Sequence, residues 1–265
     1  HPMWAMEYSR DEGLRKYWDE YSYPYHKEGA GPLYRGKDAS DHNHNQDMLA
    51  VENIRRWFDY WQERPGTGTR ISSGGVKIIF SDTNTHFRGE ENYRRSGVTD
   101  AMRIPKDAFY AHQVMWDGWV DIEQPRIHII GHWNYKEDVI KPVYVVSGAD
   151  KVELFLNGKS LGEGEREYHF LYTFKDVQFE TGKLEAIGYD ETGKECCRTE
   201  LQTAGKPEEI RLTFVQSPDG WKADGADMVL LQVEVMDKHG RRCPLANDLI
   251  HFEMMCQIIF SIVFL

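Results

Sequence analysis

The sequence predicts an α/β part followed by an all-β part. In residues 1–122, short apolar runs alternate with amphipathic segments at helical spacing, as in a repeated strand–loop–helix unit. Beyond residue 140, apolar residues recur at every second position between turns rich in glycine and asparagine. That second pattern is typical of antiparallel strands with one buried face.

The all-β part is clearest between residues 141 and 162. Its apolar positions alternate with other residues on both sides of a turn at 147–150. Asn157-Gly158 then favours a type I′ hairpin turn, because both central residues of that turn need a positive φ. These consecutive antiparallel strands bury one face, so a second sheet must cover it. The segment therefore predicts a β-sandwich.

The α/β part shows two strand–helix repeats. Apolar Trp4 and Met6 predict a short strand that ends at Glu7, and residues 48–62 predict an amphipathic helix. Residues 76–80 predict a buried parallel strand, and a helix over 106–115 follows Pro105. This order is that of a partial (β/α)8 barrel, too short to close eight strands.

Composition restricts the binding partners. The net charge of −11 and a pI near 5.5 disfavour nucleic acid, because phosphate neutralisation requires positive charge. The 13% aromatic content suits carbohydrate binding, where rings stack on sugar faces, but aromatic-rich cores explain it equally well. The apolar tail after Glu253 is shorter than the about 20 residues of a membrane span. We interpret it as a chain boundary or read-through, with no membrane partner.

Cysteine and histidine give no metal or cofactor prediction. Cys196 and Cys197 are adjacent, so on a strand they are expected on opposite faces, and all four cysteines are interpreted as free thiols. The long loop over residues 21–47 holds a possible ligand cluster: Asp41, His42, His44 and Asp47. No further ligand follows at a familiar spacing, so a solvated loop is favoured over a metal site.

Polar side chains follow both predicted strands of the α/β part. Glu7 ends the first strand, and Asp82, Asn84 and His86 follow the second. Because the carboxyl ends of barrel strands form one rim, these residues are expected to lie together in a site. Solvation of Glu7 and strand-end capping by Asp82 and Asn84 are the alternatives.

Several long motifs carry a resemblance to a known family. They are MEYS around Glu7, SGGVKIIFSDTNTH, SGVTDAMRIPKDAFYAHQVMW, IHIIGHWNY and KPVYVVSGADKVELFLNGKSLG. With them, the chain closely resembles the C-terminal half of bacterial family 2 glycoside hydrolases, the β-galactosidase-like group. The resemblance implies the end of the catalytic barrel in residues 1–122, an immunoglobulin-like β-sandwich in 123–205 and a truncated second sandwich in 206–265. Alternating apolar residues over 210–214 and 229–235 agree with the last assignment.

The resemblance also implies a retaining exo-glycosidase, with β-galactosidase favoured over β-glucuronidase and β-mannosidase. Glu7-Tyr8 matches the family's nucleophile, and Tyr8 and Arg10 are candidates to keep Glu7 ionised. Trp4 or one of the aromatic residues of the loop over 21–47 is expected to form the floor of the sugar subsite, while Asp82, Asn84 and His86 hold hydroxyl groups.

The family's Asn-Glu acid/base pair does not occur in the sequence. We therefore expect these residues alone to be inactive. We expect the parent protein to be periplasmic or secreted. A homo-oligomer agrees equally well with the sequence.

Two other function classes stay open. A carbohydrate-binding or adhesive β-module predicts an exposed aromatic platform of Trp133, Tyr135 and Tyr168, although a buried Trp133 that pins the sandwich to the barrel is favoured. A metal-dependent hydrolase built on His42 and His44 needs another ligand nearby.

Overall fold

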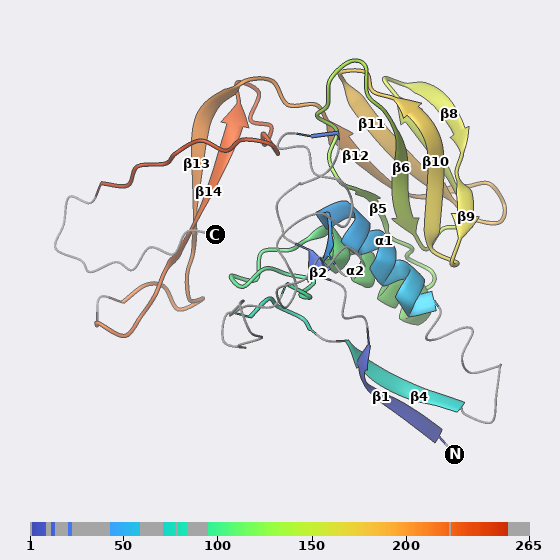
Figure 1. Cartoon of the computed structure of the whole chain (residues 1–265), viewed down its shortest axis with the longest axis horizontal. Coiled ribbons are helices and arrows are strands. Elements are labelled where there is room, and N and C mark those ends of the chain that lie inside the picture. Colours follow the sequence, from blue (N-terminus) through green and yellow to red (C-terminus); the bar gives the residue numbers. More distant parts are fainter. Residues whose placement is uncertain are drawn as a thin grey trace.

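A computed structural model describes residues 2–8, 12–13, 21–22, 43–58, 71–77, 79–83, 95–222 and 224–253, and for residues 2–8, 12, 43–44 and 71–75 it describes the backbone only. A β-sandwich forms the largest part, two helices pack beneath it, a long hairpin projects to one side of it, and a small parallel strand pair lies beyond the helices (Figure 1). Within the described part of the chain, no helix combines the length and apolarity that crossing a membrane requires.

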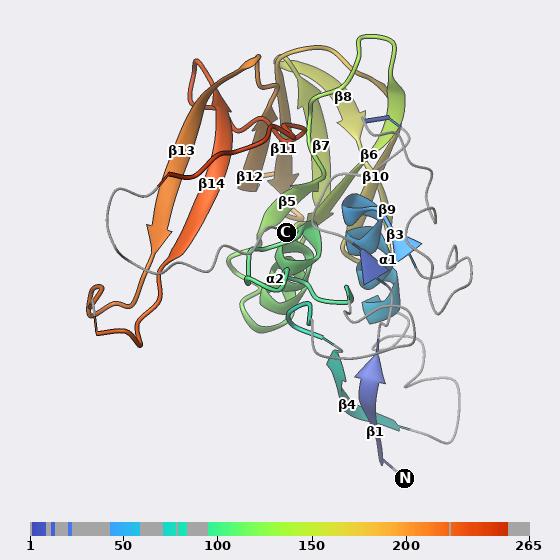
Figure 2. The same cartoon turned by 60° about the vertical axis from the view of Figure 1, so that its left-hand side comes forward.

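The sandwich consists of two four-stranded antiparallel sheets, in agreement with the sequence. One has the order β5-β6-β10-β9 and the other β12-β11-β7-β8 (Figure 2). Side chains of both sheets, among them Val145, Leu154 and Tyr172, share one buried core. The strands are β5 (Ile127–Ile130), β6 (Ile140–Ser147), β7 (Lys151–Leu156), β8 (Lys159–Glu163), β9 (Glu165–Glu167), β10 (Leu171–Gln178), β11 (Lys183–Tyr189) and β12 (Glu195–Gln202).

The two turns predicted between residues 141 and 162 do different things. Asn157 and Gly158 adopt φ values of 52° and 80° and join β7 to β8 in one sheet, as predicted. The turn after Ser147, however, passes from one sheet to the other, because β6 and β7 belong to different sheets. Alternation shows that a strand has a buried face, but both sheets of a sandwich bury the same core. The sequence pattern therefore cannot assign the strand to a sheet.

Helices α1 (Gln46–Phe58) and α2 (Asp107–Val120) pack on each other and on the sandwich. Their core, which includes Leu49 and Met115, is continuous with Val146 and Phe170 of the sandwich. At Gly118 the helix comes so close to Phe170 that an added Cβ would lie 2.5 Å from the ring. Helix α1 begins two residues before the predicted Met48, and α2 continues beyond the predicted Met115.

The remaining short strands form parallel pairs. Strand β1 (Pro2–Tyr8) pairs with β4 (Ile71–Lys77), and β2 (Glu12–Gly13) pairs with β3 (Asn43–His44). The predicted strand over 76–80 is misplaced, since β4 ends at Lys77. It is also less buried than expected: Val76 is 48% and Phe80 56% exposed. Among the described residues β4 has one neighbouring strand, β1.

A long antiparallel hairpin follows the sandwich. It consists of β13 (Pro207–Val215) and β14 (Leu230–Asp237), where the sequence predicts the start of a second sandwich. Asp237 fixes the connection, because its carboxylate accepts hydrogen bonds from the backbone N–H groups of Gly205, His239 and Arg241. The Gly205 bond is the main cause that lowers the pKa of Asp237 to about 2.

A buried histidine joins the N-terminal part to the sandwich. The backbone N–H of Asn134 donates to Nδ1 of His132, so Nε2 carries the proton and donates to Oγ of Ser22 at 2.8 Å. The ring of Tyr135 stacks on His132, and the Lys141 ammonium lies over Tyr135. Burial, followed by repulsion from Lys141, lowers the pKa of His132 well below its usual range.

We predict that His132 makes folding sensitive to acid. Below the unfolded-state pKa of about 6.5, the unfolded chain binds a proton that the folded state excludes, so the free energy of unfolding falls by about 1.4 kcal/mol per pH unit. Urea unfolding at pH 7, 6 and 5 measures this, and His132→Gln should show the smaller decrease. The exposed His251 provides the control, because His251→Gln should retain the full pH dependence. Equal slopes in all three proteins would contradict the prediction.

Candidate functional site

The backbone brings the first predicted site residues to one edge of the β1–β4 pair. These strands are parallel, so their carboxyl ends lie at the same edge, and Tyr8 is opposite Lys77. Glu7 is the next-to-last residue of β1, and Trp4 and Tyr8 lie on the same strand. Asp82 follows β4 along the chain. Arg10, Asn84 and His86 are outside the described residues.

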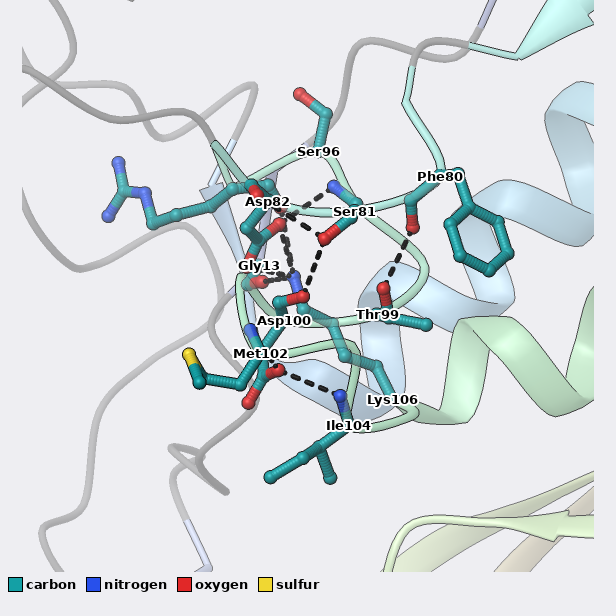
Figure 3. A network of polar contacts seen from close by, with 12 residues as sticks. Gly13, Phe80, Ser81, Asp82, Ser96, Thr99, Asp100, Met102, Ile104 and Lys106 are labelled. Carbon is teal, nitrogen blue, oxygen red and sulfur yellow. Dashed lines mark hydrogen bonds and ion pairs between the residues drawn. The ribbon is translucent and has the colours of Figure 1, made fainter. Parts of the chain in front are cut away.

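The chain around Asp82 pairs with a second segment, residues 95–100. Ser81 and Thr99 form a parallel bridge, with hydrogen bonds from Asp82 N to Thr99 O and from Thr99 N to Phe80 O at 3.1 and 3.0 Å. The hydroxyls reinforce it, because Ser81 Oγ donates to the Asp100 carbonyl and Thr99 Oγ1 donates to that of Phe80 (Figure 3). The backbone of residues 80–82 is therefore held in place by its hydrogen bonds to Thr99.

Lys106 is the centre of this network. Its side chain is 0% exposed, and it directly precedes the first residue of α2. Its ammonium donates to the carbonyl oxygens of Gly13 at 2.6 Å and Arg95 at 3.1 Å, and lies 2.9 Å from the Asp82 carboxylate. Lys106 thus ties together the segment after β1, the segment after β4 and the start of α2 (Figure 3).

The Asp82 carboxylate is held by groups of this chain, namely the Lys106 ammonium and a backbone N–H. One of its oxygens also accepts the backbone N–H of Gly97 at 2.8 Å. Burial raises the pKa of Asp82 and outweighs the opposing attraction of Lys106. Gly97 is required by packing, since an added Cβ would lie 2.3 Å from the Asp82 backbone nitrogen. These are the contacts of a residue that shapes the edge; sugar binding by Asp82 stays a prediction.

Sequence reasoning missed Lys106, Gly97 and Asp100. Asp100 Oδ1 accepts the backbone N–H groups of Met102 and Ile104, which shapes the turn that leads to Lys106. A lysine at the start of a helix is usually solvated, so no local pattern marks Lys106 as buried. Its role follows only from the tertiary arrangement of the acceptors around it.

The aromatic platform of the alternative hypothesis is not formed. Trp133 is 2% exposed, packs against Phe179 and donates Nε1 to the Glu180 carbonyl. Tyr168 packs edge-on against Phe58 of α1. The expected burial of Trp133 is therefore confirmed, but among the described residues its contacts lie within the sandwich core and not between the sandwich and the helices.

The metal hypothesis gains no support from the described residues. Asp41 and His42 fall outside them, and only the backbone of His44 is described. Asp47 is buried and accepts the Met48 N–H. Across the side chains that are described, no group of three or more His, Cys, Asp or Glu could hold a metal.

We predict that the Lys106–Asp82 pair contributes strongly to stability. Lys106→Met leaves the Asp82 carboxylate buried without its cation, so the free energy of unfolding in urea should fall by about 3–5 kcal/mol. Adding Asp82→Asn should recover part of this loss, because it removes the unpaired charge.

The exposed ion pair of Lys175 and Glu165 supplies the control. Lys175→Met should cost less than about 1 kcal/mol. A Lys106→Met variant as stable as Lys175→Met would show that the buried pair does not hold this edge together.

Comparison with known proteins finds relatives that match most of the chain. A family model described as "Domain of unknown function (DUF4982)" matches residues 138–197, within the sandwich. A β-glucuronidase of Formosa agariphila is 36% identical over 259 residues, which are 95% of this chain and 24% of that protein. A β-galactosidase of Bacteroides ovatus is 38% identical over 158 residues, 59% of this chain and 18% of that protein.

The fold agrees with these sequences. The solved structure of a β-glucuronidase from glycoside hydrolase family 2 has a TM-score of 0.76 and 34% identity, and covers 92% of this chain and 24% of that chain. The chain thus spans about a quarter of the length of the relatives it matches most fully. The similarity covers nearly the whole chain, so the chain belongs to glycoside hydrolase family 2 and corresponds to the C-terminal portion of its members.

Proposed function

We propose that this chain supplies the nucleophile of a retaining β-glycosidase, with Glu7 in that role. The observation that carries the proposal is the position of Glu7 at the carboxyl edge of a parallel strand pair, in a chain 36% identical to a β-glucuronidase. In α/β barrels this edge is where catalytic side chains project.

The order of elements supports a barrel origin for residues 1–122. Strand β1, helix α1, strand β4 and helix α2 follow one another, β1 and β4 are parallel, and the two helices pack together. We infer two strand–helix units of a (β/α)8 barrel, whose other units belong to a longer polypeptide.

The sandwich order supports an immunoglobulin-like assignment for residues 123–205. The sheet β5-β6-β10-β9 has the order of strands A, B, E and D, and β12-β11-β7 has that of G, F and C, with β8 added at the edge. We assign it a supporting role, because its core continues into α1 and α2. The residues after 205 then begin a further module.

The chemistry follows from two carboxyl groups acting in turn. Ionised Glu7 attacks the anomeric carbon and forms a glycosyl ester as the leaving oxygen is protonated; water then hydrolyses the ester. The proton donor must come from outside this sequence, which holds no Asn-Glu pair. General acid catalysis contributes about 10²- to 10⁴-fold, so these residues alone should be inactive.

The network around Lys106 gives the edge its shape in this proposal. Lys106 holds Gly13, downstream of Glu7, and Asp82, downstream of β4, on the same ammonium. Asp82, Asn84 and His86 are proposed to face the sugar hydroxyls, Trp4 to floor the subsite, and Tyr8 and Arg10 to keep Glu7 ionised.

For the substrate, we propose a terminal β-linked glucuronide ahead of a β-galactoside. The relative named β-glucuronidase matches 95% of the chain, whereas the one named β-galactosidase matches 59%. The preference for galactosides expected from the sequence has no separate support in the described residues.

We predict that Glu7→Gln abolishes turnover in the longer polypeptide that contains this chain. Nitrophenyl β-glucuronide, β-galactoside and β-mannoside turnover should fall more than about 10³-fold, because the amide cannot form the glycosyl ester. Glu52→Gln, which removes a carboxylate that pairs with Arg55 and Arg56 of the same helix, should leave turnover unchanged. A 2-fluoro glycoside should label the peptide that contains Glu7.

Turnover within a few-fold of the unaltered protein, or labelling of another carboxylate, would refute the role of Glu7. The ranking of the three sugars tests the substrate proposal separately.

A further inference from the structure

Cys196 and Cys197 lie side by side instead of on opposite faces of β12. Their sulfur atoms are 3.9 Å apart. The pairing of β11 with β12 passes from Gly188 opposite Cys197 to Tyr189 opposite Glu195, so Cys196 is the extra residue of a β-bulge. The bulge breaks the strict alternation of side chains, and the sequence expectation for this pair was therefore wrong.

Both thiols are partly accessible, and each also has a polar neighbour: Cys196 Sγ donates to the Gly188 carbonyl at 3.4 Å. The Cys197 sulfur lies over Gly188, where a Cβ added to the glycine would be 2.5 Å from it. The same sulfur is 3.7 Å from the Ser147 hydroxyl. Both cysteines are half-buried. Strand β12 is at the edge of its sheet and pairs with β11 alone. A change in the shape of β12 at the bulge would therefore disturb its pairing with β11 only, because no described strand of the sheet pairs with its other edge.

We propose that Cys196 and Cys197 form a redox-active vicinal pair, which a small-molecule disulfide such as glutathione disulfide converts into a disulfide between neighbouring residues. The site is a modification site on the sandwich, independent of the glycosidase proposal. Neighbouring Cα atoms are about 3.8 Å apart, below the 4.4–6.8 Å usual for disulfides. The bond is therefore strained and easily reduced, which suits a reversible modification.

The reaction balances in two exchange steps. The Cys196 thiolate attacks the oxidant, forming a mixed disulfide and releasing one oxidant thiolate; the Cys197 thiolate then attacks the Cys196 sulfur and releases the second. The two cysteine protons end on the two released thiols. Burial raises the pKa of both cysteines, that of Cys197 to about 12, so the less buried Cys196 reacts first.

Closure of this bond has a structural consequence within the sandwich. The sulfurs must approach from 3.9 to about 2.05 Å, and one of them, Cys197 Sγ, is 3.7 Å from the Ser147 hydroxyl. Ser147 is where the chain passes from β6 to the opposite sheet, and its hydroxyl bonds both the Arg126 carbonyl and the Ala149 N–H. The pair therefore lies in contact with the crossover between the two sheets.

Mass spectrometry tests the proposal directly. The folded chain is incubated with glutathione disulfide at pH 7 and pH 9, acid-quenched, alkylated in denaturant and digested with trypsin. Cleavage after Lys194 and Arg198 releases the peptide Glu195–Arg198. This peptide contains Cys196 and Cys197 and is separate from the peptides that contain Cys243 and Cys256. We expect this peptide to lose two hydrogens and to escape alkylation, faster at pH 9, and to be restored by dithiothreitol.

Matched variants identify the order of attack. Cys197→Ser should stop at a glutathione adduct on Cys196, and Cys196→Ser should react more slowly. A doubly alkylated peptide, or a stable glutathione adduct in the unaltered chain, would overturn the proposal. If a variant does not fold, the unaltered chain alone still decides between these outcomes.

Discussion

The buried ammonium of Lys106 is the constraint on which the arrangement of the N-terminal part depends. A charge removed from water must find acceptors, and an ammonium has three protons to place. Lys106 places them on the Gly13 carbonyl, the Arg95 carbonyl and the Asp82 carboxylate. The segments that follow β1 and β4 must therefore meet at the start of α2.

Helix α2 carries this constraint to the sandwich. It begins next to Lys106 and, near its other end, Gly118 lies against Phe170. The core that α1 and α2 share includes Val146 of β6 and Leu171 of β10, so the helices and the sandwich pack as one unit. The segments that follow β1 and β4 are thus connected, through the polar contacts of Lys106 and the packing of α2, to the sandwich that makes up most of the described structure (Figure 1).

The sequence predicted the strands and helices themselves better than the strands and segments with which they pair or pack. Alternation and the Asn157-Gly158 turn are local signals, and the β7–β8 hairpin forms as expected. The sheet assignment of β6 and β7, the bulge at Cys196 and the burial of Lys106 depend on contacts between distant segments. The apolar run over 76–80 misled because its composition suits a strand buried on both faces, whereas Val76 and Phe80 are exposed here. The choice of Glu7 as the candidate nucleophile came from a family resemblance, since a carboxylate at a strand end is not distinctive by itself.

Hydrogen exchange at the β1–β4 edge tests the central claim most directly. The backbone N–H groups of Asp82, Gly97 and Lys106 all donate within the network. If Lys106 locks this edge to the packed helices, these amides should exchange as slowly as those of β7 and β11 in the sandwich core. Fast exchange at the three amides, while β7 and β11 stay protected, would contradict the account.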